Sequence, residues 1–308
     1  METIVHELSL NPKVTMVRCG IWKPRTRPGG FEGMGETALQ WIREIKQQHP
    51  LLQFCCEVAK PSHIEACIRY GIDAVWIGAR TSGNPFSMAE LTESLRGTNM
   101  PIMVKNPMMP DINAWIGAIE RCCQIGADQV IAIHRGFNVF NNLGYRNNPL
   151  WEIPMEFKRR MPEIPIICDP SHICGNRKIV ADMAQTALDF NFDGLMIEVH
   201  NHPQQALTDG AQQITPHELN NLLDKLVVKH ESNIPNAELN TLRSQIDTID
   251  KEILNLVESR LALSKKIAEI KRTHNLTIYQ PKRWEEVLNQ KLQLADELGL
   301  SKDFVKEL

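Results

Sequence analysis

Cationic side chains recur in this sequence at positions where several of them could bind one phosphate-bearing ligand. The loop from Lys23 to Gly30 (KPRTRPGG) carries three cations and a hydroxyl around two prolines, which stiffen the backbone and limit its entropy loss on binding. Further cations follow short apolar runs, at Arg80, Lys105 and Arg135. Each of these alone is as well explained by a structural ion pair. Their convergence would favour a ligand with two or three negative charges.

A second group of residues has the chemistry of a metal site. The motifs that carry it are Asp169-Pro170-Ser171-His172, Ile197-Glu198-Val199-His200 and Thr208-Asp209-Gly210. Taken singly, such residues are usually hydrogen-bonded in loops. Taken together on neighbouring strands, imidazole and carboxylate donors suit a borderline divalent metal ion.

The elements that must position these side chains alternate in type. Seven β-branched, near-continuously apolar runs predict parallel strands covered on both faces: 14–19, 53–58, 74–79, 101–106, 129–135, 164–170 and 194–200. Helical patterns separate them, at 35–48, 61–70, 87–95, 111–124, 154–160, 178–190 and 216–228. The polar residues, including Glu57 and His200, lie at the carboxyl ends of the strands, which favours a barrel over an open sheet.

A closed (β/α)8 barrel needs eight strands, and the segment before the first run, residues 3–10, reads as a helix. We therefore predict an α/β fold, a TIM barrel over residues 1–230 that lacks its first strand. That strand is expected to precede Met1. A polar stretch predicts a linker over 231–236.

The remaining residues, 237–308, predict a separate all-α domain. Apolar residues recur at three- and four-residue steps from Leu239 to Ile270, as in one long amphipathic helix. A second helix is expected from Pro281 to about Leu298, and a third begins at Ser301, so the domain is expected to lack most of its last helix. Arg260 interrupts the apolar stripe, and a cation there is costly unless it is paired or functional.

Composition narrows the class of protein. The chain is 43% hydrophobic and 23% charged, with a formal charge of −3, so it has no basic field for nucleic acid. No apolar run is long enough for a membrane span, and the N-terminus shows no secretory signal, which together favour the cytoplasm. The eight cysteines lack a C-x-x-C spacing and are interpreted as buried hydrophobes.

From Val14 to Gln213 the chain resembles type I 3-deoxy-D-arabino-heptulosonate 7-phosphate synthases of the β subtype. The motifs KPRT, IGAR, VK, HRG, DPSH, IEVH and TDG carry the resemblance. It implies condensation of phosphoenolpyruvate with erythrose 4-phosphate in aromatic amino acid biosynthesis, with Lys105, Arg25 and His172 catalytic. It implies that phosphoenolpyruvate is bound by Arg18, Lys23, Arg80, Lys105 and Arg135. It implies that erythrose 4-phosphate is bound by Lys23, Arg25, Thr26 and Asp169. It also implies a divalent metal ion (Mn, Fe, Co or Zn) held by His172, Glu198 and Asp209.

One departure from this family pattern and one competing family leave alternatives open. The family's fourth metal ligand, a cysteine after the first barrel strand, has no counterpart here, and Cys174 is only a weak substitute. The sister enzyme that makes 3-deoxy-octulosonate 8-phosphate also resembles the chain, but it typically carries K-A-N-R-S where this chain has KPRT. The KPRT loop therefore favours the four-carbon aldose.

The helical tail resembles the all-helical chorismate mutases, which are intertwined dimers. The resemblance implies rearrangement of chorismate to prephenate in a homodimer or higher homo-oligomer. Arg260 and Lys271 would be catalytic, and Arg243 would reach the partner's site. Chorismate would be bound by Arg243, Arg260, Lys271 and Arg283. Alternatively, the tail is mainly a regulatory and dimerisation module that senses chorismate or prephenate, or the chain is an inactive fragment.

Overall fold

A computed structural model describes residues 1–307 except 24–28, 128, 141–143 and 230–236. The chain divides into two compact units, Met1–Glu231 and Ser232–Leu308. Each unit is described by itself. The predicted linker, 231–236, lies outside the described residues, so its boundaries stay a prediction.

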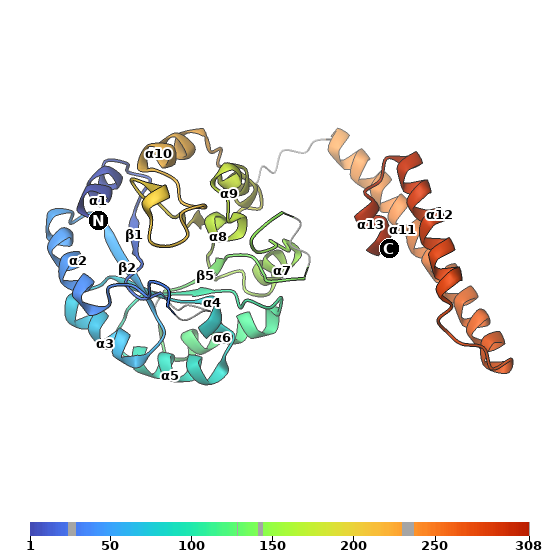
Figure 1. Ribbon diagram of the computed structural model, residues 1–308, viewed down its shortest axis with the longest axis horizontal. Coiled ribbons are helices and arrows are strands. Elements are labelled where there is room, and N and C mark those ends of the chain that lie inside the picture. The colour runs from blue at the N-terminus through green and yellow to red at the C-terminus, as the bar shows by residue number, and fades with distance from the viewer. Residues whose placement is uncertain (24–28, 128, 141–143, 230–236, 308) are drawn as a thin grey trace. The chain divides into compact units, whose positions relative to one another are not determined.

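In the described part of the first unit, seven strands form one parallel sheet in sequence order, β1-β2-β3-β4-β5-β6-β7. Figure 1 shows the sheet curled on itself, with helices around its outer face. The strands are β1 (Met16–Cys19), β2 (Gln53–Val58), β3 (Ala74–Ile77), β4 (Ile102–Lys105), β5 (Val130–His134), β6 (Ile166–Cys168) and β7 (Gly194–Leu195).

Side chains alternate between two apolar clusters, because successive residues of a strand point to opposite faces. Phe54 and Cys56 of β2 pack outward in the main core between the sheet and the helices. Cys55, between them, points inward to a smaller cluster with Trp76 and Met103. The near-continuous apolar runs of the sequence follow from this burial on both faces.

The helices of this unit cover the sheet. They are α1 (Glu2–Ser9), α2 (Glu36–Gln48), α3 (Pro61–Tyr70), α4 (Ala79–Ser82), α5 (Pro85–Leu95), α6 (Ile112–Gln124), α7 (Glu152–Arg160), α8 (Pro170–Cys174), α9 (Val180–Asp189) and α10 (Pro216–Lys225). Helix α10 begins with a capping box between Thr215 and Glu218. Helices α1 and α10 lie side by side, and Asn11, just after α1, donates to Asn220 of α10 at 2.8 Å.

The predicted β/α alternation is confirmed. Several strands begin or end one or two residues inside the predicted runs, and the largest difference is at the carboxyl end of β7. The predicted strand over 194–200 is short: β7 ends at Leu195, and within the described part of the chain Val199 makes one further bridge, to Ile214. Helices α4 and α8 begin where strands were expected to continue. At α8 the reason is local, because Asp169 caps the helix through its side chain and Pro170 occupies the first turn.

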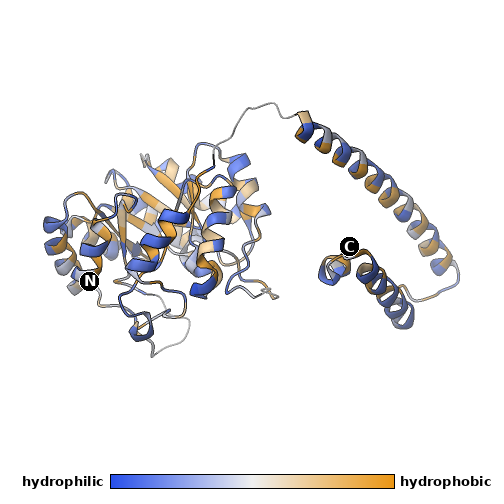
Figure 2. Cartoon of the chain, turned by 90° about the horizontal axis from the view of Figure 1, so that it is seen from above, coloured by the Kyte–Doolittle hydropathy of each residue, from blue (hydrophilic) through white to orange (hydrophobic). Residues whose placement is uncertain are grey.

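The second unit consists of α11 (Ala237–Thr273), α12 (Pro281–Leu298) and α13 (Lys302–Glu307). Hydrophobic and hydrophilic residues alternate along α11 (Figure 2), and none of its 37 residues is buried. Ile246, Ile253 and Ile267 of the predicted stripe are each about half exposed or more. Among the described residues, no helix has the length and apolarity that crossing a membrane would require.

Candidate functional site

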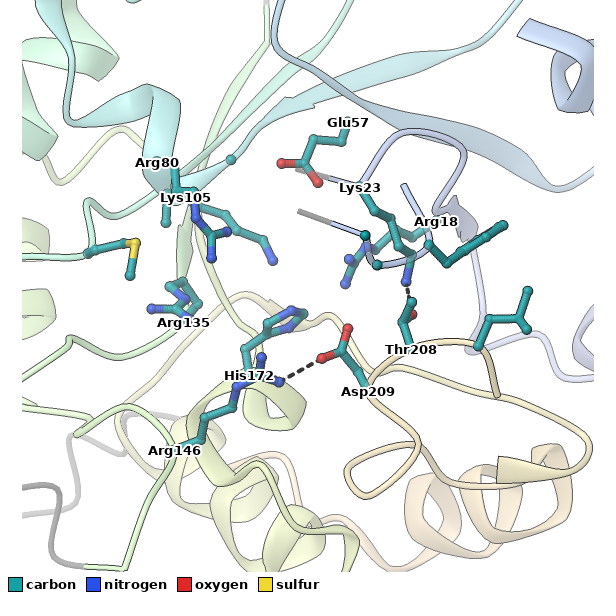
Figure 3. Close-up of a pocket in the computed structure, with 17 residues that line it drawn as sticks. Arg18, Lys23, Glu57, Arg80, Lys105, Arg135, Arg146, His172, Thr208 and Asp209 are labelled. Atoms are coloured by element: carbon teal, nitrogen blue, oxygen red, sulfur yellow. Dashed lines mark hydrogen bonds and ion pairs between the residues drawn. The ribbon is translucent and has the colours of Figure 1, made fainter. Parts of the chain in front are cut away.

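The residues at the carboxyl ends of the strands surround one cavity of about 590 Å³. Figure 3 shows side chains from several strand ends directed into it. Among the described residues, its polar lining is Arg18, Lys23, Glu57, Arg80, Lys105, Arg135, Arg146, His172, Thr208 and Asp209. The predicted convergence of cations on this face of the barrel is therefore observed, although their roles remain predictions.

A buried ion pair lies at the base of the cavity. The Nζ of Lys105, at the end of β4, donates to Oδ2 of Asp169 at 2.7 Å, and both side chains are almost fully buried. Burial lowers the pKa of Lys105, and the Asp169 charge opposes that shift. Burial would raise the pKa of Asp169, but His172 and Lys105 hold it well below its usual value.

His172 lies on the other side of the same carboxylate. Its Nδ1 is 2.8 Å from Oδ2 of Asp169, and its backbone N–H donates to Oδ1. Burial lowers the pKa of His172, so the ring is neutral at pH 7. A neutral imidazole that bonds a carboxylate through Nδ1 keeps its Nε2 as an acceptor or ligand atom.

Arg135, at the end of β5, is held by neutral acceptors. Its backbone N–H donates to Oδ1 of Asn106 at 2.7 Å, and its Nη1 donates to Oδ1 of Asn147 at 2.8 Å. Burial lowers the pKa of Arg135 to about 10; Asp169 opposes the shift, and the charges of Arg146 and Arg80 add to it. Guanidinium groups this close together favour an anion with more than one charge.

Arg18, on β1, occupies the interior of the barrel. Its guanidinium lies 4.8 Å above the ring of Trp76, and its Nη1 is 3.3 Å from Oε1 of Glu198. Oε2 of Glu198 accepts a hydrogen bond from Gln212 at 2.6 Å. The buried Nη1 of Arg18 makes no hydrogen bond of adequate geometry among the described residues, so its contact with Glu198 is an ion pair without a well-formed hydrogen bond.

The three predicted metal ligands lie near one another but each has another partner. Glu198 pairs with Arg18, Asp209 pairs with Arg146 at 2.9 Å, and His172 bonds Asp169. One imidazole and two carboxylates are donor types that suit a borderline divalent ion. Among the described residues, however, no three His, Cys, Asp or Glu side chains form a group that could hold a metal ion.

The other predicted site residues divide into three groups. Arg25 and Thr26 lie outside the described residues, whereas Lys23 donates to Thr208 at 2.7 Å. Asp169 is fully buried behind the cavity. Cys174 gains no support as a ligand, because it is buried in the main core and its Sγ contacts the Ile179 carbonyl at 3.4 Å.

Sequence reasoning assigned no role to three residues of the polar lining. Arg146 belongs to an irregular polar segment with no pattern that could have found it. Thr208 stood inside a quoted motif without a role. Glu57 stood at a predicted strand end, and its carboxylate fills the space above Gly78, where a Cβ would lie 2.1 Å from Oε1.

The second unit contains a cavity of about 420 Å³. Three of the four residues predicted to bind chorismate line it: Arg260, Lys271 and Arg283. Arg283 also pairs with Glu286 at 3.1 Å. Arg243 is not part of this lining, and it bonds Asn240 on its own helix. Its predicted role in a partner's site stays a prediction.

Family models match both units. Residues 4–233 match the DAHP synthetase I family. The chain belongs to this family. Residues 242–308 match chorismate mutase type II, so a helical domain of the mutase family follows the synthase domain in one polypeptide.

Individual relatives agree with the family models. Phospho-2-dehydro-3-deoxyheptonate aldolase from Thermotoga maritima is 29% identical over 214 residues, which are 70% of this chain and 60% of that enzyme. A crystal structure under the same enzyme name and organism superposes with a TM-score of 0.65 and 27% identity, covering 73% of this chain and 63% of the other. The chain thus spans less than two thirds of the length of these relatives.

Two further relatives concern the alternatives. A bifunctional chorismate mutase/prephenate dehydratase from Aquifex aeolicus is 46% identical over 61 residues, 20% of this chain and 17% of that protein. A 2-dehydro-3-deoxyphosphooctonate aldolase from a Synechococcus strain is 26% identical over 149 residues, 44% of this chain and 51% of that enzyme. The octulosonate enzyme is therefore the more weakly matched of the two barrel relatives.

Proposed function

We propose that the barrel cavity condenses phosphoenolpyruvate with erythrose 4-phosphate to 3-deoxy-D-arabino-heptulosonate 7-phosphate and phosphate. The observation that supports this most is the convergence of five predicted phosphoenolpyruvate-binding cations, Arg18, Lys23, Arg80, Lys105 and Arg135, on one cavity. Carbon 3 of phosphoenolpyruvate attacks the aldehyde carbon and forms the new C–C bond. Water then adds at carbon 2, and the C–O bond to phosphate breaks.

In this proposal the buried cations bind the carboxylate and phosphate and stabilise the charge that develops during the reaction. Lys105 acts where burial makes its charge most effective, and His172 lies beside it on the shared Asp169 carboxylate. Lys23, Asp169, Arg25 and Thr26 would bind erythrose 4-phosphate. The support for this last set is the resemblance, together with the place of Lys23 in the lining.

We propose that His172, Glu198 and Asp209 hold a divalent metal ion, with Mn, Fe, Co and Zn as the candidates. Such an ion supplies Lewis-acid polarisation of the aldehyde oxygen when bound. The support is the donor set and the neutral state of the His172 ring. Titration of chelator-treated protein with Mn²⁺ tests this: His172→Ala should abolish binding and Cys174→Ala should leave it unchanged, whereas binding that survives in His172→Ala would refute the assignment.

The choice of aldose is tested by phosphate release from phosphoenolpyruvate with either erythrose 4-phosphate or arabinose 5-phosphate. We expect release with erythrose 4-phosphate, because of the KPRT loop and the longer match to the heptulosonate enzymes. Release with arabinose 5-phosphate alone would overturn the choice. Release with neither aldose, in the presence of Mn²⁺, would favour the inactive-fragment alternative.

We propose that the helical unit rearranges chorismate to prephenate. Arg260, Lys271 and Arg283 in its cavity would bind the carboxylates and ether oxygen and hold the reactive diaxial conformer, so catalysis is electrostatic and conformational. The exposed apolar stripe of α11 supports a homodimer, or a higher homo-oligomer, in which Arg243 reaches the partner's site. Sedimentation equilibrium tests the oligomer, and a monomer would remove this role of Arg243.

The alternative function of the tail, regulation by chorismate or prephenate, is tested on the same chain. We expect mutase turnover that Arg260→Gln abolishes. The regulatory module would be favoured by two results together. Prephenate would inhibit the synthase in the native chain but not in Arg260→Gln, and the native chain would show no mutase turnover. We also propose a cytoplasmic location, which the eight free cysteines support because such thiols persist in reducing compartments.

A further inference from the structure

Arg146 lies among the cations of the barrel cavity, although neither the sequence pattern nor the proposed function gives it a role. It lines the cavity together with Arg80 and Arg135. Its charge contributes to the lowered pKa of Arg135, so these guanidinium groups lie within electrostatic reach of one another. A third guanidinium at this place raises the charge that a bound anion could neutralise.

The backbone of Arg146 is fixed to the helix that carries His172. Its N–H donates to the Ile173 carbonyl at 3.0 Å, and the N–H of Asn147 donates to the same oxygen at 3.1 Å. Gly175, at the C-cap of α8, leaves room for the side chain: a Cβ there would lie 2.5 Å from Cβ of Arg146. The position of Arg146 at the mouth of the cavity is therefore built into the packing.

The guanidinium of Arg146 bonds the carboxylate that the proposed function assigns to a metal ion. Its Nη1 donates to Oδ1 of Asp209 at 2.9 Å and to Oε1 of Gln212 at 2.6 Å. Gln212 in turn donates to Glu198, the other proposed carboxylate ligand. The side chain of Arg146 is 45% exposed and that of Asp209 16%, so the arginine is the partner nearer the open side.

We infer that Arg146 is a further phosphate-binding residue, which Asp209 and Gln212 hold until a divalent cation takes the Asp209 carboxylate. A carboxylate that binds a cation interacts less strongly with a guanidinium, which then turns to the substrate's phosphate. The inference rests on the proposed function and adds a consequence: cation and phosphate ester bind cooperatively, because each removes the other's competitor. Both proposed substrates of the barrel are phosphate monoesters, so either can be the source.

Calorimetric titration of the full chain tests this inference, with phosphoenolpyruvate and erythrose 4-phosphate as separate probes, each with Mn²⁺ and with chelator. Arg146→Gln should weaken one ester in Mn²⁺ by about tenfold or more, the value of one charge-assisted hydrogen bond, and Arg146→Lys should lose less. Asp209→Asn should tighten the same ester in chelator. Arg69→Gln is the control, because it removes an exposed pair with Glu36 on α2.

Arg146→Gln should weaken ester binding and Asp209→Asn should strengthen it. If the ion pair between Arg146 and Asp209 were purely structural, both substitutions would weaken ester binding. The ester that responds identifies the substrate that Arg146 contacts. If the native chain binds an ester and Arg146→Gln binds both unchanged, this inference is wrong and the proposed function stands. If the native chain binds neither ester, both fail. If circular dichroism shows that Arg146→Gln does not fold, the test rests on Asp209→Asn. Binding of both esters in chelator that is unchanged or weaker in Asp209→Asn would then overturn the inference.

Discussion

Replacing Lys105 by methionine should destabilise the barrel unit more than most single substitutions, because it leaves Asp169 as a buried carboxylate without its cation. At 2.7 Å the pair is worth about 6 kcal/mol at an effective dielectric constant of about 20, before the cost of burying two charges. Removal of one partner of a buried pair typically costs about 3–5 kcal/mol. His172 is neutral and still bonds Asp169, so we expect a loss near the lower end, about 3 kcal/mol.

Asp169→Asn should cost less than Lys105→Met. Burial already lowers the pKa of Lys105, so the lysine can lose its proton once the carboxylate is gone, whereas Asp169 is held ionised. The double variant Lys105→Met/Asp169→Asn has no buried charge at this position, and it should recover about half of the loss in Lys105→Met.

Urea unfolding followed by tryptophan fluorescence measures these differences. Every tryptophan except Trp284 lies in the barrel unit, so a Trp284→Phe background reports on that unit alone. Arg96→Gln, which removes an exposed pair with Glu93, is the control and should change stability by less than about 1 kcal/mol. A loss below about 1 kcal/mol in Lys105→Met, or a double variant less stable than both single ones, would refute the reasoning.

Three further predictions concern single residues. Burial lowers the pKa of His134 to about 3, so below about pH 6.5 the unfolded chain binds a proton that the folded chain does not. The free energy of unfolding should therefore decrease by about 1.4 kcal/mol for each unit by which the pH falls below that value. In His134→Phe, the urea midpoints measured between pH 7 and pH 5 should depend less on pH. Gly78→Ala should displace Glu57 from the cavity and lower the kcat/KM of the synthase about tenfold or more, while the unfolding midpoint shows whether overpacking alone explains the change. Arg260→Gln should lower mutase kcat/KM by about 10²-fold or more, and Arg272→Gln, on the same helix but outside the cavity lining, should not.

The sequence predicted the barrel well because its signals are local. Strand β2 and helix α3 have the bounds that periodicity and flanking residues indicate. The end of β6 was missed because the Asp169 cap and Pro170 start a helix at once, and such capping depends on side-chain geometry. The shortening of β7 has a different cause, because pairing with the neighbouring strand decides where a strand ends.

The candidate site could be predicted only in part. Lys105, Arg135 and His172 lie at or just past strand ends, and the barrel brings the carboxyl ends of the strands to one face. Arg146 comes from an irregular segment, and it reaches the cavity because its backbone bonds Ile173 on another element. Such a contact leaves no periodic trace in the sequence, so no pattern of residue types could have indicated it.

The charges of the cavity lining show how one unit keeps several cations close together. Lys105, Arg18 and Arg146 each pair with a carboxylate of the same unit. For Lys105 and Arg18, whose side chains are mostly buried, the pairing limits the cost of burying the charge. Arg135 differs, because its side-chain hydrogen bonds in the described structure go to neutral oxygens and its pKa is lowered. An incoming anion therefore gains most at Arg135, where it competes with no carboxylate for the guanidinium. At the paired cations it must first displace an acidic partner, so the affinity of the cavity for phosphate should depend on whatever else binds those carboxylates.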